Sequence, residues 1–243
     1  GFFVARAGLG ASESMRSKLA EYNDPRLSRA FITKQGASGK EQAPGTADNA
    51  VYAPNGTPEQ GTSKYGTSLF MYSISAPTLL LSYHELKFLE AEALCRLERD
   101  AKSALKDAVV AGLLNAENSF TISRKELGKT LINAASSITE AEAESYFNNT
   151  IEAKYTAEPL KTTMIQKYFA LWGASGEATE SYNDVRRMKG LGENFIELKN
   201  PNSFPLRCPY GNSDTTTNAE VKAAYGNGQY VYSENVWWAG GSR

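Results

Sequence analysis

The chain has 243 residues, a formal net charge of -1 and 41% hydrophobic residues, which is the composition of an ordinary globular protein. A net charge this close to zero gives no general attraction to nucleic acid or to an anionic membrane surface, so we expect no nucleic-acid partner. No apolar run in the sequence reaches the length of a transmembrane helix.

The first 75 residues predict one short helix and a long loop. Segment 12–22 carries apolar residues one helical turn apart, and Pro25 is expected to end the helix. Residues 26–32 read as a short extended piece. Residues 34–68 are polar and rich in Gly, Pro, Thr and Asn, and loops of this length are usually functional or disordered. Residues 69–75 are expected to be a short strand or an extended lead-in.

The segment from Ser82 to Arg99 predicts the strongest helix. Ser82 with Glu85 three residues later has the pattern of a capping box. Apolar residues recur at three- and four-residue steps along one side, and further ones widen that side: Leu86, Leu89, Ala93 and Leu97, then Phe88, Ala91 and Cys95. We therefore expect this helix to pack on both flanks as the central strut of the core. Glu92, near the apolar face, needs a cationic or hydrogen-bonding partner.

A second helix is expected directly after the first. Asp100 can cap it, and the short connection requires an antiparallel hairpin over 83–114. Four further helices are predicted: 124–135 and 140–155, each opened by a capping box, one opened by Pro159, and one over 177–188.

After residue 190 the composition changes to Pro, Gly, Asn and aromatic residues, with one short helix expected near 218–225. The predicted fold class is therefore mainly α, with tetratricopeptide-like helical hairpins and a loop-rich, aromatic portion that faces ligand. We expect a single domain over residues 1–243, with a helical core at about 76–188 and a loop-rich tail over 189–243.

Catalytic chemistry finds little support in the sequence. It contains no HExxH, Walker loop, CxxC or GxSxG motif. The only histidine, His84, is expected to be a surface or a satisfied residue. The glutamates Glu85, Glu90 and Glu92 could suggest the carboxylate pair of a glycoside hydrolase, but three within two helical turns are more often structural and solvated groups. We expect no enzymatic activity, no cofactor and no metal.

Aromatic residues in the loops are better candidates for function. An exposed ring offers a flat apolar face with a polar edge, which suits the C–H face and the hydroxyl rim of a sugar. The alternative is that these rings fix the loops onto the helices. The candidate ligand-binding residues are Tyr52, Tyr65, Tyr72, Tyr230, Tyr232, Trp237 and Trp238.

The order and spacing of several motifs resemble the carboxyl-terminal half of SusD/RagB-type proteins, the outer-membrane nutrient-binding lipoproteins of Bacteroidetes. The motifs are Asn23–Arg26, Ser75–Pro77, Leu81–Glu85, Phe88–Ala93, Ile165–Leu171, Tyr182–Arg187, Phe204–Arg207 and Asn235–Trp238. No single motif is specific, whereas their order over about residues 20–240 is. Members of this family are commonly about twice as long as this chain.

The resemblance implies a helical fold and a non-enzymatic role at the cell surface. The expected function is to bind a nutrient, in most members a glycan, and to deliver it to a TonB-dependent transporter of the SusC type. The family is anchored in the outer membrane by a lipidated cysteine that is not visible in this chain. The alternatives are a structural or protein-docking helical domain and a glycoside hydrolase.

The shared motifs also predict a buried polar network. Acidic and basic residues far apart in the sequence are expected to pair inside the fold, because an arginine fork matches a carboxylate. The candidates are Asp24, Arg26, Glu92, Arg186 and Arg187.

Overall fold

The computed structural model describes residues 10–33, 52–56, 65–199, 203–226 and 230–241. Most of the predicted loop over 34–68 lies outside these residues. The contacts divide the chain into two compact units, residues 1–198 and residues 199–243. Each unit is described by itself below, and the prediction of a single domain remains a prediction.

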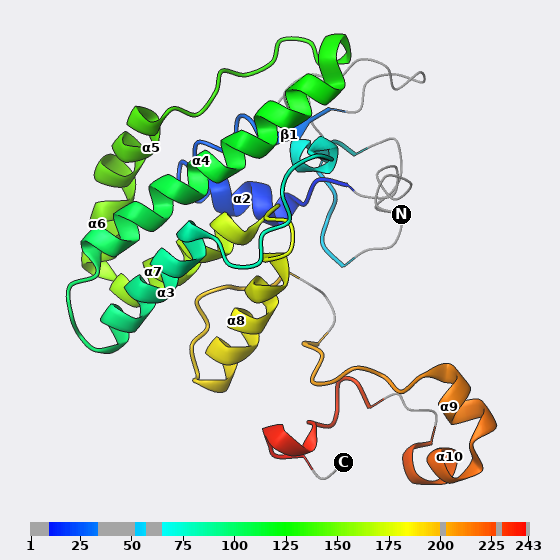
Figure 1. The fold of residues 1–243 in the computed structure, drawn as a ribbon. Coiled ribbons are helices and arrows are strands. Elements are labelled where there is room, and N and C mark those ends of the chain that lie inside the picture. Colours follow the sequence, from blue (N-terminus) through cyan, green and yellow to red (C-terminus); the bar gives the residue numbers. More distant parts are fainter. Residues whose placement is uncertain (1–9, 34–51, 57–64, 200–202, 227–229, 242–243) are drawn as a thin grey trace. The chain divides into compact units, whose positions relative to one another are not determined.

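The first unit is almost entirely helical, which confirms the predicted fold class (Figure 1). Its longer helices are α2 (Glu13–Glu21), α3 (Tyr83–Arg96), α4 (Lys102–Leu127), α5 (Glu140–Tyr146), α6 (Glu152–Ala157), α7 (Pro159–Leu171) and α8 (Ala178–Gly190). A π-helical turn over Phe147–Ile151 joins α5 to α6, and short 3-10 helices cover Leu69–Tyr72 and Gly128–Thr130. The strands β1 (Phe31–Ile32) and β2 (Thr67–Ser68) pair antiparallel.

Helix α7 is the centre of the first unit. It contacts α3, α4, α6 and α8, and nine of its thirteen residues are buried. Pro159 occupies its first turn as predicted, where the missing amide costs no hydrogen bond. The predicted central strut, α3, is therefore one wall of the core and not its middle.

Helix α3 packs on one side only. It forms the predicted antiparallel hairpin with α4 (Figure 1), and its buried residues include Phe88, Ala91 and Glu92. The face expected to be buried is the exposed one: Leu86, Leu89 and Leu97 are 51%, 41% and 66% exposed, and Ala93 is exposed as well. Both sides of this helix carry apolar residues, so periodicity could not indicate which side would meet α4 and α7.

Helix α4 runs without interruption from Lys102 to Leu127, so the predicted helix start near residue 124 is wrong. Ser123 is fully buried, and its hydroxyl donates to the carbonyl oxygens of Leu69 and Ser119 at 2.7 and 2.9 Å. A serine whose hydroxyl is satisfied in this way is tolerated within a helix, so the capping pattern at residues 123 and 126 was misleading.

Side-chain caps confirm the predicted starts of α3 and α5. The hydroxyls of Ser82 and Thr139 accept from the backbone amides three residues on, Glu85 and Glu142, at 3.1 and 3.2 Å. The second hydrogen bond of a capping box runs from the backbone amide of Ser82 to the Glu85 side chain, and at α3 this amide has a different acceptor. The amide of Ser82 donates to the carboxylate of Glu177, which lies 95 residues away in sequence.

Segment 69–75 was expected to be a strand or an extended lead-in, and its first four residues form a 3-10 helix. Phe70 packs its ring against Phe120 of α4 and Trp172 after α7, with centroids 4.7 and 5.1 Å apart. Gly173 follows with φ +81°, and a Cβ there would lie 2.4 Å from the Phe70 ring. This aromatic contact explains why a helical turn replaces the predicted extended chain.

The second unit contains α9 (Asn212–Thr217), α10 (Ala219–Tyr225) and a 3-10 turn at Trp237–Ala239. The predicted helix near 218–225 is present as α10, and the side chain of Asn218 caps it. The rings of Tyr210 and Tyr225 stack with centroids 4.4 Å apart, which holds α10 against the chain before α9.

Candidate functional site

The predicted ligand-binding rings of the first unit are all partly buried. Tyr52 lies edge-on to Phe31 with ring centroids 5.2 Å apart, and the Arg16 guanidinium lies 5.6 Å from its centroid. Tyr72 packs against the core, and Tyr65 is half-buried. The contacts of Tyr52 and Tyr72 resemble those of rings that fix a loop.

The predicted rings of the second unit are more open. Tyr232 is 53% exposed, Trp237 is 75% exposed, and Tyr230 is partly buried. The Trp238 side chain lies outside the described part of the chain. The predicted rings therefore form two groups, one in each unit.

Asp24 and Arg26 form a buried pair beside α7. Nε and Nη2 of Arg26 donate to the two carboxylate oxygens of Asp24 at 2.8 and 2.6 Å, and Nη1 donates to the carbonyl oxygen of Phe169 at 2.7 Å. The Tyr146 hydroxyl lies 3.3 Å from Asp24, and Gln166 donates to that hydroxyl. With Asp24 and Arg26 only 3% and 2% exposed, this cluster ties the segment after α2 to α5 and α7.

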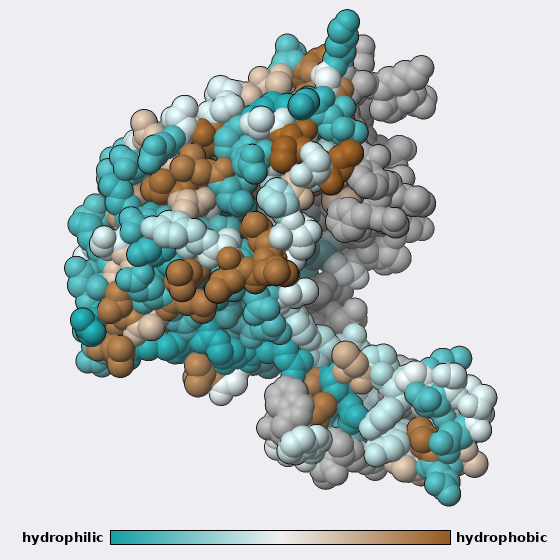
Figure 2. Space-filling view, in the orientation of Figure 1, coloured by the Kyte–Doolittle hydropathy of each residue, from teal (hydrophilic) through white to brown (hydrophobic). Residues whose placement is uncertain are grey.

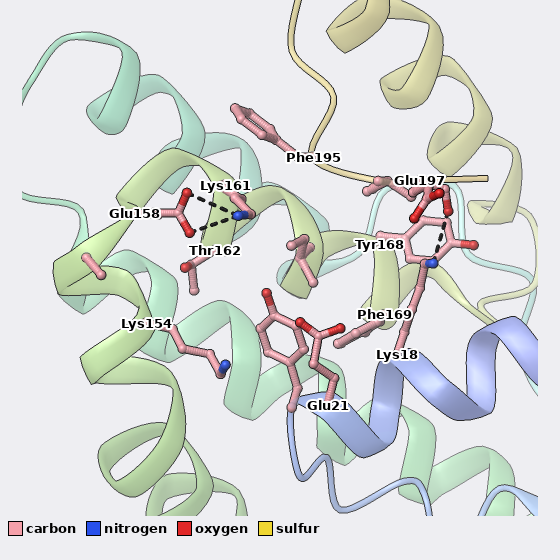
Figure 3. Close-up of a pocket in the computed structure, with 14 residues that line it drawn as sticks. Lys18, Glu21, Lys154, Glu158, Lys161, Thr162, Tyr168, Phe169, Phe195 and Glu197 are labelled. Atoms are coloured by element: carbon pink, nitrogen blue, oxygen red, sulfur yellow. Dashed lines mark hydrogen bonds and ion pairs between the residues drawn. The ribbon is translucent and has the colours of Figure 1, made fainter. Parts of the chain in front are cut away.

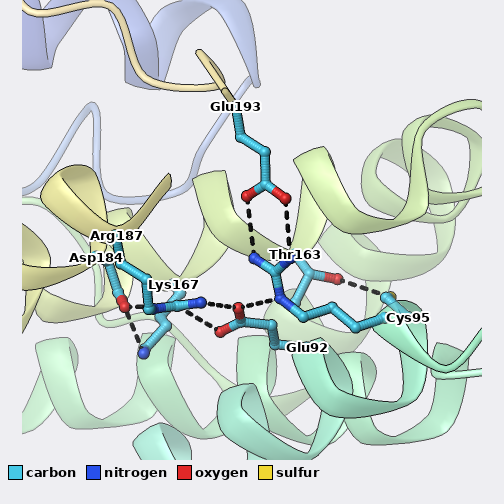
Figure 4. Close-up of polar contacts among 8 residues, drawn as sticks. Glu92, Cys95, Thr163, Lys167, Asp184, Arg187 and Glu193 are labelled. Carbon is cyan, nitrogen blue, oxygen red and sulfur yellow. Dashed lines mark hydrogen bonds and ion pairs between the residues drawn. The ribbon is translucent and has the colours of Figure 1, made fainter. Parts of the chain in front are cut away.

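Glu92 lies in a second, separate polar cluster (Figure 4). Its carboxylate accepts from Nε of Arg96 at 2.7 Å and from Nη2 of Arg187 at 2.8 Å. Burial opposes the ionisation of Glu92, but hydrogen bonds from Arg187 and Arg96 outweigh it and hold the pKa of this carboxyl below its usual range. Arg187 also donates to Asp184 at 2.8 Å, and Asp184 pairs with the buried Lys167 at 2.7 Å.

The second cluster extends to the chain after α8. Nη1 and Nη2 of Arg96 donate to the two carboxylate oxygens of Glu193 at 2.8 and 3.0 Å (Figure 4). The cluster therefore joins α3, α7 and α8 with the segment that follows α8. Nη1 of Arg186 donates to the Tyr182 hydroxyl at 3.3 Å, and that Arg186 shares a network with Arg187 stays a prediction.

A third polar group lies at the start of α3. His84 is 3% exposed, so it is not a surface residue, and its Nε2 lies 3.6 Å from the Glu177 carboxylate. Burial lowers the pKa of His84, and the charge of Glu177 opposes this shift. Burial and hydrogen bonding with Glu177 raise the pKa of Glu85 to about 7. Glu85 and Glu177 therefore lie together in a buried site, and Glu85 gains or loses its proton near neutral pH.

The first unit also has a cavity of about 310 Å³ between α2, α6, α7 and residues 195–197 (Figure 3). This volume is at the lower end of the range of small-molecule sites, about 300–1,000 Å³. The apolar part of its wall consists of Tyr22, Ala157, Ile165, Tyr168, Phe169, Phe195 and Ile196. None of the ligand-binding residues predicted from sequence lines it.

The charged part of the wall is balanced. Three lysines and three glutamates line the cavity: Lys18, Lys154, Lys161, Glu21, Glu158 and Glu197. Nζ of Lys161 lies 2.8 Å from the Glu158 carboxylate, and Nζ of Lys154 lies 4.5 Å from the centroid of the Tyr22 ring. Burial, with the charges of Glu21 and Glu158, raises the pKa of Tyr22 to about 12. Rings among donors and acceptors with no excess of charge suit a neutral polyhydroxyl ligand.

One sequence signal could have pointed to this cavity. Phe195 belongs to the Gly- and Asn-rich chain after α8, whose other rings were considered as ligand contacts. Ile196 and Glu197 follow Phe195 in the same segment, and the other lining residues come from the end of α2, from α6 and from α7, which only the fold brings together.

No group of histidine, cysteine, aspartate and glutamate side chains among the described residues could hold a metal ion. In the same part of the chain, no helix combines the length and the apolar character needed to cross a bilayer. We expect a chelator such as EDTA to change the melting temperature by less than about 1 °C, because metal-dependent domains unfold when chelated. A circular-dichroism melt with and without EDTA measures this, and a drop of several degrees would show that a structural metal was overlooked.

Residues 3–210 match the family model of SusD-like proteins, described as starch-binding and associating with the outer membrane. A SusD/RagB family protein from Bacteroides thetaiotaomicron has a solved structure with 65% sequence identity to this chain and a TM-score of 0.90. The match covers 100% of this chain and 52% of the Bacteroides thetaiotaomicron chain. No curated protein matches the chain at a significant level.

Two more distant structures share the fold. A SusD homologue from Bacteroides fragilis has 18% identity and a TM-score of 0.62, over 95% of this chain and 52% of its own. A candidate nutrient-binding outer-membrane protein from Bacteroides vulgatus has 21% identity and a TM-score of 0.62, over 93% of this chain and 51% of its own. The chain therefore spans about half the length of each of these solved proteins.

Proposed function

The chain belongs to the SusD-like family, and on that premise we propose that it binds a neutral oligosaccharide at the outer membrane without chemically changing it. The ligand then passes to a TonB-dependent transporter of the SusC type. The observation that carries this proposal is the family match over residues 3–210, whose description names starch binding and the outer membrane.

The cavity of Figure 3 is the site that we assign to the ligand. All of its lining residues lie inside the family match, whereas Tyr230, Tyr232 and Trp237 lie beyond residue 210. Its balanced charge supports a neutral ligand, because a cavity for an anionic or cationic ligand would carry an excess of the opposite sign. Its volume of about 310 Å³ supports binding of part of an oligosaccharide, while the rest of the ligand remains outside.

The chemistry of the cavity supports a binding role over a hydrolytic one. Hydrolysis of a glycosidic bond needs one carboxylic acid and one carboxylate placed on either side of the bond. Here Glu158 forms an ion pair with Lys161, and burial raises the pKa of the Tyr22 phenol to about 12, so this phenol stays protonated near neutral pH.

Isothermal titration with a panel of neutral oligosaccharides, starting with maltooligosaccharides, tests the proposal. We expect binding without any product detectable by chromatography after prolonged incubation. The double variant Lys154→Ala/Phe195→Ala should bind about tenfold or more weakly, since it removes a hydrogen-bond donor and a ring from the cavity wall.

The matched control is Trp237→Ala, which removes the most exposed tryptophan side chain described in the second unit. We expect it to bind as the wild type does. Loss of binding in this variant alone would move the site to the predicted rings of the tail. Failure of every oligosaccharide to bind, or release of shorter sugars, would contradict the proposed function.

A further inference from the structure

Three tyrosine side chains are buried in the described part of the first unit: Tyr22, Tyr146 and Tyr155. The hydroxyl of Tyr155 accepts from the Ala101 amide at 2.8 Å, and the hydroxyl of Tyr146 donates to the Asp24 carboxylate at 3.3 Å. The hydroxyl of Tyr22 has no hydrogen-bond partner among the described residues. Buried phenols normally have such a partner, so the free hydroxyl of Tyr22 needs an explanation.

The Tyr22 hydroxyl is held in the wall of the cavity of Figure 3. Tyr22 lines this cavity although it is only 6% exposed, and its ring lies edge-on to Phe169 with centroids 5.4 Å apart. The hydroxyl oxygen is not among the enclosed atoms that lack a partner, so a molecule in the cavity can reach it. Burial, with the charges of Glu21 and Glu158, raises the pKa of the phenol to about 12, so it keeps its proton and can donate.

Two charged side chains beside Tyr22 also lack an ion-pair partner within the part of the chain that the structure describes. Nζ of Lys154 lies 4.5 Å from the centroid of the Tyr22 ring, and Glu21 is near enough for its charge to act on the phenol. Figure 3 shows Lys154 extending into the cavity from α6 and Glu21 from α2. Lys161 of the same wall is, by contrast, already paired with Glu158.

The apolar surface over α3 offers no such groups. Figure 2 shows an apolar band over α3 and the segment leading into it, where Leu80, Leu86 and Leu89 are exposed. Leucine side chains neither donate nor accept hydrogen bonds, whereas the cavity places a hydroxyl, an ammonium and a carboxylate beside aromatic rings. A hydroxyl-rich molecule therefore finds rings and polar groups together in the cavity.

We propose that Tyr22, Lys154 and Glu21 hold two adjacent hydroxyl groups of a sugar ring inside the cavity. The Tyr22 hydroxyl and the Lys154 ammonium donate to the oxygen of one hydroxyl, and the Glu21 carboxylate accepts from the other. Each sugar hydroxyl offers an acceptor oxygen and a donor proton, so the pair complements two donors and one acceptor. This inference rests on the proposed function, because it names the contacts of the same site.

The variant Tyr22→Phe tests the proposal, because it removes one oxygen and keeps the ring. Isothermal titration would use maltotriose and every other oligosaccharide of the panel that binds the wild type. Tyr22→Phe should bind about fivefold or more weakly, since this oxygen forms its hydrogen bond only in the complex. Its melting temperature should equal or exceed that of the wild type, because the free protein loses no hydrogen bond. Glu21→Gln and Lys154→Met should each weaken binding about tenfold, because hydrogen bonds to charged groups are stronger.

The matched control is Tyr155→Phe, which makes the same chemical change outside the cavity. It leaves the Ala101 amide without its acceptor, so the melting temperature should fall by about 3 °C or more. Binding measured well below that temperature should equal wild-type binding. A near-ultraviolet difference spectrum gives an independent reading: the tyrosine absorption should change when the same oligosaccharides are added to the wild type and to Tyr155→Phe, but not to Tyr22→Phe.

Two results would overturn the inference and leave the proposed function standing. One is wild-type affinity in Tyr22→Phe. The other is a loss of thermal stability in Tyr22→Phe as large as that in Tyr155→Phe, which would assign the hydroxyl to the fold. If no oligosaccharide binds the wild type, the proposed function fails and this inference fails with it.

Discussion

Replacing Asp24 by alanine should lower the free energy of unfolding by about 3–5 kcal/mol, the cost of leaving a buried charge without its partner. Arg26 is only 2% exposed and directs three nitrogens at fixed acceptors, two of them carboxylate oxygens of Asp24. Without the carboxylate, the guanidinium keeps one carbonyl oxygen, that of Phe169, and water cannot reach the rest. The variant should therefore lose more stability than Glu92→Ala, which leaves Arg96 and Arg187, 30% and 40% exposed, where water can hydrate them.

Urea denaturation followed by circular dichroism measures this loss. The matched control is the double variant Asp24→Ala/Arg26→Met, which removes the buried charge together with its partner and should recover part of the stability. A second control, Lys161→Ala, breaks an exposed ion pair with Glu158 and should cost no more than about 1 kcal/mol. Equal losses in the Asp24 and Lys161 single variants would mean that Arg26 finds other partners or solvent.

The stability of the protein should decrease as the pH rises from about 5 to about 8, through the ionisation of Glu85. The pKa of this carboxyl is about 7 in the folded protein, against an ordinary value of 4.5 for a glutamate in water. The folded state therefore binds the proton more tightly, so its stabilising effect is fully present below the lower value and is lost as the pH passes the higher one. A shift of this size corresponds to at most about 3 kcal/mol.

Other groups around Glu85 set the shape of the pH profile. Glu177 and Glu180 disfavour its charged form, and Lys167 favours it. His84 has the opposite effect on stability. Burial lowers its pKa, so the folded state disfavours the charged imidazole, and this loss of stability disappears as the pH rises toward 6.5. The difference between two variants is therefore more informative than the profile of the wild type alone.

The variant Glu85→Gln keeps the shape of the protonated side chain and cannot ionise. It should match the wild type near pH 5 and exceed it in stability at pH 8, as measured by urea midpoints across the range. Glu90→Gln, on the exposed side of the same helix, should follow the wild-type profile. A Glu85→Gln variant that is less stable than the wild type at pH 8 would show that the carboxylate is ionised and well paired at that pH.

The polar clusters explain how a helix such as α7 can carry Gln166 and Lys167 in the core. Gln166 bonds to Tyr146 in the cluster of Asp24 and Arg26, whereas Lys167 pairs with Asp184 in the cluster of Glu92 and Arg187. The helix thus joins two separate polar groups. The sequence had predicted one network, because it shows which residues are charged but not on which side of a helix each one lies.

The sequence by itself determined where several helices begin. Ser82 and Thr139 cap α3 and α5, and Pro159 opens α7, because these signals act on backbone groups within three residues of each other. The mainly helical content and the resemblance to the family also followed from the sequence, since motif order and periodicity are properties of the linear chain.

Only the tertiary structure decided which faces these helices bury and which residues meet. Leu86 and Phe88 both read as core residues, yet α4 and α7 cover only Phe88. Ser123 read as a helix start, yet it lies buried where its hydroxyl reaches the carbonyl oxygen of Leu69. The physical reason is the same in each case: burial and long-range hydrogen bonds depend on segments far away in the sequence, and a local pattern contains no information about which of them will pack beside it.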